Sequence, residues 1–184
     1  MALSGIIKSV IGPYNQYDLT IEWQVNNQYK AERTSNITVV LKCWRNDETS
    51  NSNGAYNLAA NNTIKLSVGG SLKVDNTTAT IDLRSATPVT LASWTGDVPH
   101  NSNGELGLEL IGSFYFNAVG ADSLPQGEYC VSGMAVIDPI NGLVRILNGS
   151  SSKTEFYQPY IRKGANWDLY DPHIHASADW KSCL

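Results

Sequence analysis

Three histidines are the side chains of this sequence best suited to proton chemistry, and they are His100, His173 and His175. Catalysis requires a nucleophile, a base and an orienting group held together. The sequence has no Gly-x-Ser-x-Gly motif, no His-Glu-x-x-His motif and no glycine-rich phosphate loop ahead of a helix. We therefore predict that the protein is not an enzyme and that it carries no cofactor.

The segment DVPHNSNG, residues 97–104, is the most distinctive short motif of the chain. Its Asp and Asn side chains offer oxygens like those of a calcium loop, but the acidic ligand that a hand-type loop places after them is missing. Asn-Gly is above all a turn signal. Two interpretations stay open: a structural hairpin whose histidine hydrogen bonds across the turn, or an ion-binding or other binding loop. The candidate residues are Asp97, His100, Asn101, Asn103 and Gly104.

The C-terminal segment contains a duplication with a spacing of 13 residues. Pro159, Ile161, Ala165 and Trp167 recur as Pro172, Ile174, Ala178 and Trp180. Each copy predicts a β-hairpin, and a lone two-stranded hairpin is marginally stable in water. The hairpins therefore need a surface, which is either their own domain, a second copy or another protein, unless the aromatic side chains stack on sugars. The candidate interface or glycan-stacking residues are Tyr160, Trp167, Tyr170 and Trp180.

Composition indicates a globular β-protein. The 184 residues are 42% hydrophobic and 16% charged, and they include nine Tyr, five Trp and fifteen Gly. The net charge of −4 opposes binding to nucleic acid or to an anionic membrane. The N-terminus MALSGIIKSVIGPYNQ predicts neither a secretion signal nor a membrane anchor. Three cysteines predict reduced thiols, with Cys43 and Cys130 as small core residues.

Alternation of apolar and polar residues predicts antiparallel strands, each with one buried face. It is clearest in YDLTIEWQV, SNITVVLKCW and TATIDLR, and Gly69-Gly70 predicts a two-residue hairpin. In ELGLELIGSFYF the alternation shifts phase at Ile111-Gly112, which suggests a β-bulge. Eight or nine such strands are typical of an antiparallel β-sandwich, immunoglobulin-like or jelly-roll-like. The predicted inward residues are Trp23, Ile37, Val39, Leu41, Ile81 and Leu83.

The predicted domain organisation has four parts. An N-terminal arm covers residues 1–16, the β-sandwich covers 17–148, and a small, polar linker covers 149–154. Two 13-residue hairpin repeats occupy residues 155–184. The sequence thus predicts an all-β sandwich with a short, duplicated β-hairpin tail.

The segments YDLTIEWQV, RTSNITVVLKCW and LASWTGDVPHNSNGE resemble a family of virion structural proteins from tailed phages of Gram-positive bacteria, a family known mainly by its unknown function. The resemblance covers roughly residues 17–137 and is carried by Trp23, by residues 35–38, by Trp94 and by the Val-Pro-His-Asn-x-x-Gly turn at residues 98–104. This chain is shorter than many members, which are long tail-tip proteins. The repeats PYIRKGANW and PHIHASADW also look like the C-terminal units of tail and baseplate proteins of such phages.

The resemblance implies a virion structural protein of the tail, baseplate or a fibre, made in the bacterial cytoplasm and acting in assembly, in host-surface contact or in both. The expected partners are other virion proteins and further copies of the chain, with a cell-surface glycan as an open alternative and with no nucleic acid or membrane. Two other functions stay open. One is a lectin-like carbohydrate-binding module for cell-wall glycans, and the other is a capsid-decorating protein.

His173 and His175 raise one further alternative. Two residues apart in a strand, they point to the same side, and three chains meeting there would place six imidazoles around one metal ion. His-x-His segments of this kind resemble those in the needle-like trimeric fibres of some phages. The first repeat has Tyr160 and Arg162 at the matching positions, so the two histidines are equally well explained as polar surface residues.

Overall fold

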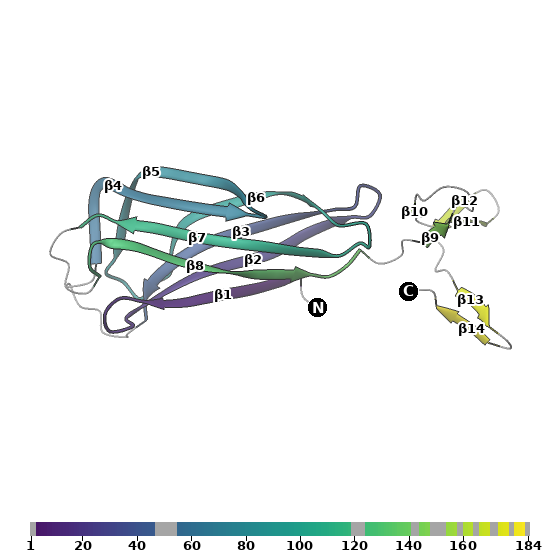
Figure 1. Cartoon of the computed structure of the whole chain (residues 1–184), viewed down its shortest axis with the longest axis horizontal. Coiled ribbons are helices and arrows are strands. Elements are labelled where there is room, and N and C mark those ends of the chain that lie inside the picture. Colours follow the sequence, from purple (N-terminus) through teal and green to yellow (C-terminus); the bar gives the residue numbers. More distant parts are fainter. Residues whose placement is uncertain are drawn as a thin grey trace.

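The computed structural model describes residues 3–46, 55–118 and 124–140, and after these only the backbones of six short strands between residues 144 and 182. Eight long strands form two four-stranded sheets that lie face to face (Figure 1). Every pair of neighbouring strands in them is antiparallel. The predicted all-β antiparallel sandwich is therefore confirmed.

The first sheet has the strand order β1-β2-β3-β6, and the second has the order β5-β4-β7-β8. The first contains β1 (Ser4–Ile11), β2 (Tyr17–Tyr29), β3 (Thr34–Arg45) and β6 (Val89–Pro99). The second contains β4 (Ala55–Val68), β5 (Ser71–Leu83), β7 (Leu106–Phe116) and β8 (Gly127–Ile137).

The core lies between the two sheets and follows the alternation of the sequence. In β3 every second residue from Ser35 to Arg45 is buried, while the residues between them are partly exposed. This is the pattern expected when one face of a strand packs on a core and the other meets solvent. All six residues predicted to point inward are buried, namely Trp23, Ile37, Val39, Leu41, Ile81 and Leu83.

The hairpin between β4 and β5 forms where Gly69-Gly70 predicts it. Both glycines have positive φ angles, 59° and 73°, which residues with a side chain rarely adopt. Two consecutive positive φ angles are those of a type I′ turn, whose twist matches the flanking strands. The backbone N–H of Gly69 also donates to the carbonyl of Glu109 in β7 at 2.8 Å, which anchors the turn to the neighbouring strand.

The prediction of a β-bulge at Ile111-Gly112 is wrong. Strand β7 pairs with β4 and β8 without a register shift there, and its buried and exposed residues alternate from Leu106 to Phe116. Gly112 faces inward. This inward position suits a glycine because the side chain of Leu41, from the opposite sheet, fills the space that a larger residue would need. A Cβ atom at Gly112 would lie 2.5 Å from Leu41 Cδ1.

The N-terminal segment, predicted as an arm, includes a strand of the sandwich. Strand β1 pairs with β2 from Ser4 opposite Gln24 to Ile11 opposite Tyr17. It also lies beside β8, the edge strand of the other sheet. There the side chain of Ile7 packs on Gly133, and its Cγ2 lies 3.0 Å from the position that a Cβ atom at Gly133 would occupy. This contact closes one side of the sandwich.

The cysteines differ in position. Cys43 is fully buried as predicted, and burial, followed by the nearby Asp18 carboxylate, raises the pKa of its thiol to about 12. The prediction for Cys130 is wrong, because this thiol is exposed. In β8 the alternation turns Val131 and Ala135 toward the core and leaves Cys130 on the outer face.

Six four-residue strands follow the sandwich and form three two-stranded sheets. Strand β9 lies within the bounds 17–148 predicted for the sandwich, but it pairs with β10 and not with either four-stranded sheet. The predicted linker lies outside the described residues except for Thr154, which begins β10. The strands are β9 (Val144–Leu147), β10 (Thr154–Tyr157), β11 (Tyr160–Lys163), β12 (Asn166–Leu169), β13 (His173–Ala176) and β14 (Asp179–Ser182).

We predict that Gly112→Ala lowers the free energy of unfolding by about 1–3 kcal/mol, because its new methyl group overlaps a buried leucine. Gly107→Ala in the same strand is the matched control, since its Cβ would meet only Met134 Cε at 3.5 Å. The control should change stability by less than about 1 kcal/mol. Urea unfolding measures both, and equal midpoints for the two variants would contradict this account of the sheet contact.

Candidate functional site

The loop between β6 and β7 is held by the buried side chain of His100. Its Nδ1 lies 2.6 Å from the carbonyl oxygen of Gly104, and its Nε2 lies 2.7 Å from Ser35 Oγ. A carbonyl oxygen only accepts, so Nδ1 carries the proton and donates to it. In the neutral ring Nε2 is then an acceptor and receives the hydroxyl proton of Ser35. His100 therefore bonds across its turn, as predicted, and also joins the turn to β3.

Asn101 organises the rest of the turn. Its Oδ1 accepts from the backbone N–H groups of Asn103 and Glu105, both at 2.9 Å. Its backbone carbonyl accepts from the N–H of Gly104, whose φ of 81° suits glycine. The Asn101 side-chain oxygen that a cation would need is thus already occupied by backbone donors.

Asp97 does not join this group. It belongs to β6 and accepts a hydrogen bond of 2.6 Å from Asn36 Nδ2 of β3. The structure therefore brings His100, Asn101, Asn103 and Gly104 together in one turn and leaves Asp97 outside it, on β6. Within the described residues, no cluster of three or more His, Cys, Asp or Glu side chains is arranged to hold a metal ion. The turn is held together by hydrogen bonds among its own residues and is tied to β3 through His100.

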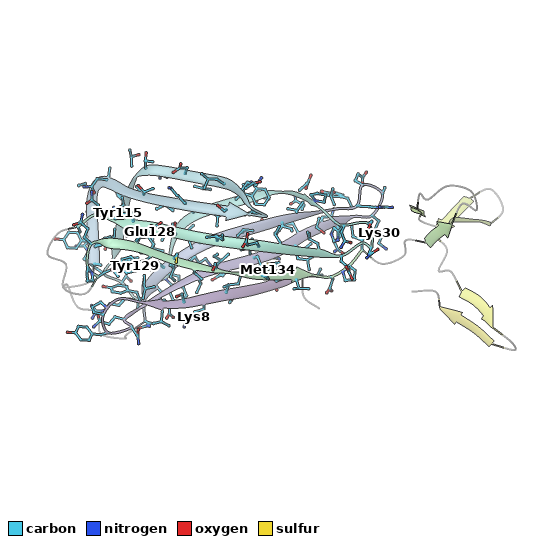
Figure 2. The ribbon with its side chains drawn as sticks, in the orientation of Figure 1. Lys8, Lys30, Tyr115, Glu128, Tyr129 and Met134 are labelled. Atoms are coloured by element: carbon cyan, nitrogen blue, oxygen red, sulfur yellow. The ribbon has the colours of Figure 1, made fainter. Side chains whose placement is uncertain are left out.

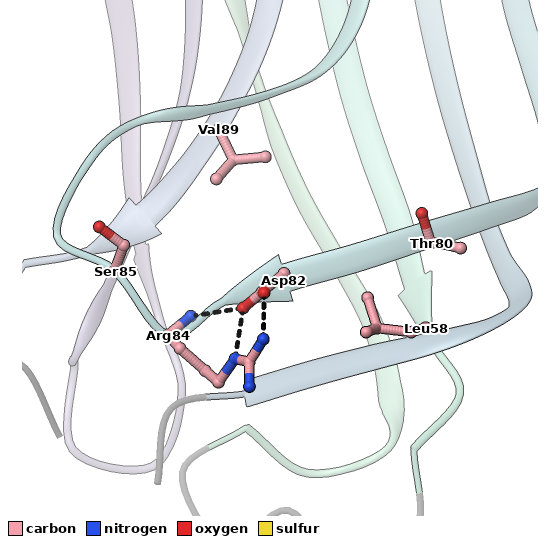
Figure 3. Close-up of a pocket in the computed structure, with 6 residues that line it drawn as sticks. All are labelled: Leu58, Thr80, Asp82, Arg84, Ser85 and Val89. Atoms are coloured by element: carbon pink, nitrogen blue, oxygen red, sulfur yellow. Dashed lines mark hydrogen bonds and ion pairs between the residues drawn. The ribbon is translucent and has the colours of Figure 1, made fainter. Parts of the chain in front are cut away.

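A shallow hollow at the end of β5 contains an ion pair that the sequence did not single out (Figure 3). Arg84 donates to Asp82 from Nε at 2.8 Å and from Nη2 at 2.5 Å, which lowers the pKa of the Asp82 carboxyl group. The Arg84 guanidinium also lies 4.5 Å from the ring centre of Tyr56. Because residues two apart in a strand share a face, the spacing in IDLR is the signal that could have revealed this pair. The hollow is lined by Leu58, Thr80, Asp82, Arg84, Ser85 and Val89.

The charges of this hollow are balanced within it. The carboxylate accepts both guanidinium hydrogen bonds, and one face of the guanidinium is covered by the tyrosine ring. The hollow thus has a neutral rim and apolar surface from Leu58 and Val89. Among its described lining residues, the one carboxylate, Asp82, is already bonded to Arg84.

The residues predicted to act in the tail lie on the short strands. Trp167 in β12 pairs in register with Arg162, and Trp180 in β14 pairs with His175. Tyr160 and His173 begin β11 and β13. Tyr170 and the side chains of the whole tail lie outside the described residues, so interface contacts, glycan stacking and metal binding there stay predictions.

Comparison of the chain with protein-family models, curated proteins and solved structures gave no match. The resemblance to phage virion proteins therefore stays a prediction. In the part of the chain that the structure describes, no helix has the length and hydropathy needed to cross a membrane.

We predict that His100→Ala lowers the free energy of unfolding by about 1–3 kcal/mol, because it leaves buried polar partners unsatisfied. Ser102→Ala, at an exposed position of the same turn, should change it by less than about 0.5 kcal/mol. A double-mutant cycle with Ser35→Ala should give a coupling of about 1 kcal/mol by chemical denaturation. If His100→Ala leaves stability unchanged, the loop is not held by this side chain.

Proposed function

We propose that the protein is a non-enzymatic structural protein of a phage virion, located in the tail, baseplate or a fibre. Its sandwich is the folded body, and its C-terminal hairpins make the contacts of assembly. The resemblance of the segments around Trp23, Trp94 and the His100 turn to phage virion proteins supports the virion part of this proposal. The pairing of the C-terminal strands supports the assembly part.

The contrast in strand pairing is the observation that carries the proposal. The strands of the sandwich have 8–14 residues and belong to four-stranded sheets. Those of the tail have four residues each and pair only in twos. Strands this short gain few hydrogen bonds, and an isolated two-stranded sheet does not offset the entropy lost when its chain is ordered. The tail therefore needs a surface to stabilise it.

The two repeats form hairpins of the same register. In β11–β12 the third residue of the first strand, Arg162, pairs with Trp167, the second residue of the next strand. In β13–β14 the same positions are filled by His175 and Trp180. Each repeat thus has one tryptophan at the same register position of its hairpin, and equivalent units suit contact with equivalent surfaces in a symmetric assembly.

The assembly part predicts that the full chain oligomerises and that a chain ending at residue 140 is a folded monomer, because it keeps all eight strands of the sandwich. Trp167→Ala with Trp180→Ala should weaken the oligomer at least about tenfold. Tyr14→Ala with Tyr29→Ala, which removes two exposed aromatic side chains from the sandwich, is the control and should leave it intact. Light scattering after size-exclusion chromatography measures the oligomeric state of each variant. A full chain that is monomeric at all concentrations would contradict the assembly part of the proposal.

The virion part predicts that antibodies against the sandwich label intact phage particles that package this protein. Because the tail, baseplate and fibres are distinct in electron micrographs, immunogold labelling locates the protein directly. Label confined to the capsid would favour a capsid-decorating protein. Complete absence of the protein from purified particles by mass spectrometry would overturn the proposal.

A further inference from the structure

The outer face of the β1-β2-β3-β6 sheet carries a hydrogen-bonded network of side chains that spans three strands. Asn26 Nδ2 of β2 donates to Asn36 Oδ1 and to Thr38 Oγ1 of β3, both at 2.9 Å. Thr38 Oγ1 lies 2.9 Å from Thr95 Oγ1 of β6, and Asn36 Nδ2 donates to Asp97. Hydrogen bonds between side chains are a small share of those in proteins, so four in a row across a solvated face are unusual.

The network fixes the side chains but leaves some of their polar atoms available. Both hydrogens of the Asn26 amide are used, whereas no described residue donates to its Oδ1. The hydroxyl groups of Thr38 and Thr95 carry one proton each, and their mutual hydrogen bond uses only one of the two. The other hydroxyl proton remains available to a ligand. Amides and hydroxyls held in fixed positions lose little entropy when they bind, which favours recognition.

A groove on the same face continues the network through Thr38. Its volume of about 440 Å³ lies within the range of roughly 300–1,000 Å³ of small-molecule sites. Gln24 and Thr38 give it polar groups, while Ile6 and Val40 give it apolar surface. These residues come from three strands: Ile6 from β1, Glu22 and Gln24 from β2, and Thr38 and Val40 from β3.

Four of the five charged side chains on this face form two ion pairs. Lys42 Nζ lies 2.6 Å from Glu22 Oε2, and Lys8 Nζ lies 2.6 Å from Asp18 Oδ2. The fifth, the carboxylate of Asp97, accepts a hydrogen bond from the neutral amide of Asn36 and keeps its negative charge. The face therefore has no excess of positive charge that would attract phosphates or other polyanions. A ligand that matches it is uncharged, rich in hydroxyl or amide groups, and apolar on part of its surface.

The opposite outer face has a different character. Ile111, Met134 and Val136 are exposed on β7 and β8, and Met134 is labelled in Figure 2. The register places Met134 opposite Glu109 and Val136 opposite Gly107, so exposed apolar side chains lie here where the first sheet carries amides and hydroxyls. The two faces thus differ within one molecule, and the second supplies a matched control for the first.

We infer that the outer face of the β1-β2-β3-β6 sheet binds a neutral glycan along the groove and the network. Sugar hydroxyls donate to Asn26 Oδ1 and exchange hydrogen bonds with Thr38 and Gln24, while the C–H face of a ring lies on Ile6 and Val40. This inference goes beyond assembly through the tail and does not depend on it, because every residue involved belongs to the sandwich.

The test titrates the full chain by calorimetry with four neutral hexasaccharides, which are chitohexaose, cellohexaose, laminarihexaose and maltohexaose, at up to about 10 mM. We expect at least one to bind, and Asn36→Ala with Thr38→Val to weaken it at least about tenfold, the effect of losing a well-placed hydrogen bond. Thr63→Val, at a half-buried threonine on the central strand β4 of the other sheet, should leave affinity unchanged.

Three outcomes would overturn the inference. The first is that none of the four hexasaccharides binds. The second is that binding survives the double substitution on β3 or is weakened equally by Thr63→Val. The third is that Trp167→Ala with Trp180→Ala abolishes binding while the β3 variant retains it, which would move the glycan site to the tail. Free energies of unfolding of all variants within about 0.5 kcal/mol of the parent exclude loss of the fold as the cause.

Discussion

The packing of the two sheets at Leu41 and Gly112 is the constraint on which much of the rest of the structure depends. Leu41 projects from β3 into the space that a side chain at Gly112 would occupy on β7. A shift of β7 by one residue would place Ile111 or Ser113 in that space and turn the inward leucines of the strand to solvent. The contact therefore fixes which residues of both sheets form the outer faces, including the polar network on one and the apolar residues on the other.

Alternation in the sequence was enough to predict the sandwich and its inward residues, because burial on one face of a strand imposes a period of two. It failed where an inward position is not occupied by an apolar side chain. Gly112 was interpreted as a bulge because its partner Leu41 is distant in sequence. Strand β1 was missed because Ile6 and Ile7 are adjacent and both apolar, although they face opposite sides of the sheet. The turn at His100 was predictable from its own residues, whereas its link to Ser35, 65 positions away, required the fold. The network of Asn26, Asn36 and Thr38 had no local signal, since each residue alone resembles an ordinary solvated position.

The chain thus combines two parts with opposite requirements. The sandwich has its own core, a loop held by the buried side chain of His100, and one side closed by the contact of β1 with β8. Its stability therefore does not call for a partner. The tail consists of repeated hairpins of two four-residue strands, and in our proposal a partner supplies the surface that stabilises them. A preorganised sheet face of amide and hydroxyl groups on the sandwich would leave that body free to meet a glycan while the tail holds it in place.

The central claim, that the tail is ordered by assembly and the sandwich is not, is tested most directly by amide hydrogen exchange followed by mass spectrometry across a dilution series. The account predicts that peptides covering β1 to β8 stay protected at every concentration, whereas those covering β11 to β14 gain protection only where the oligomer forms. The account would be contradicted if the peptides of the hairpin repeats were as strongly protected in the monomer as in the oligomer.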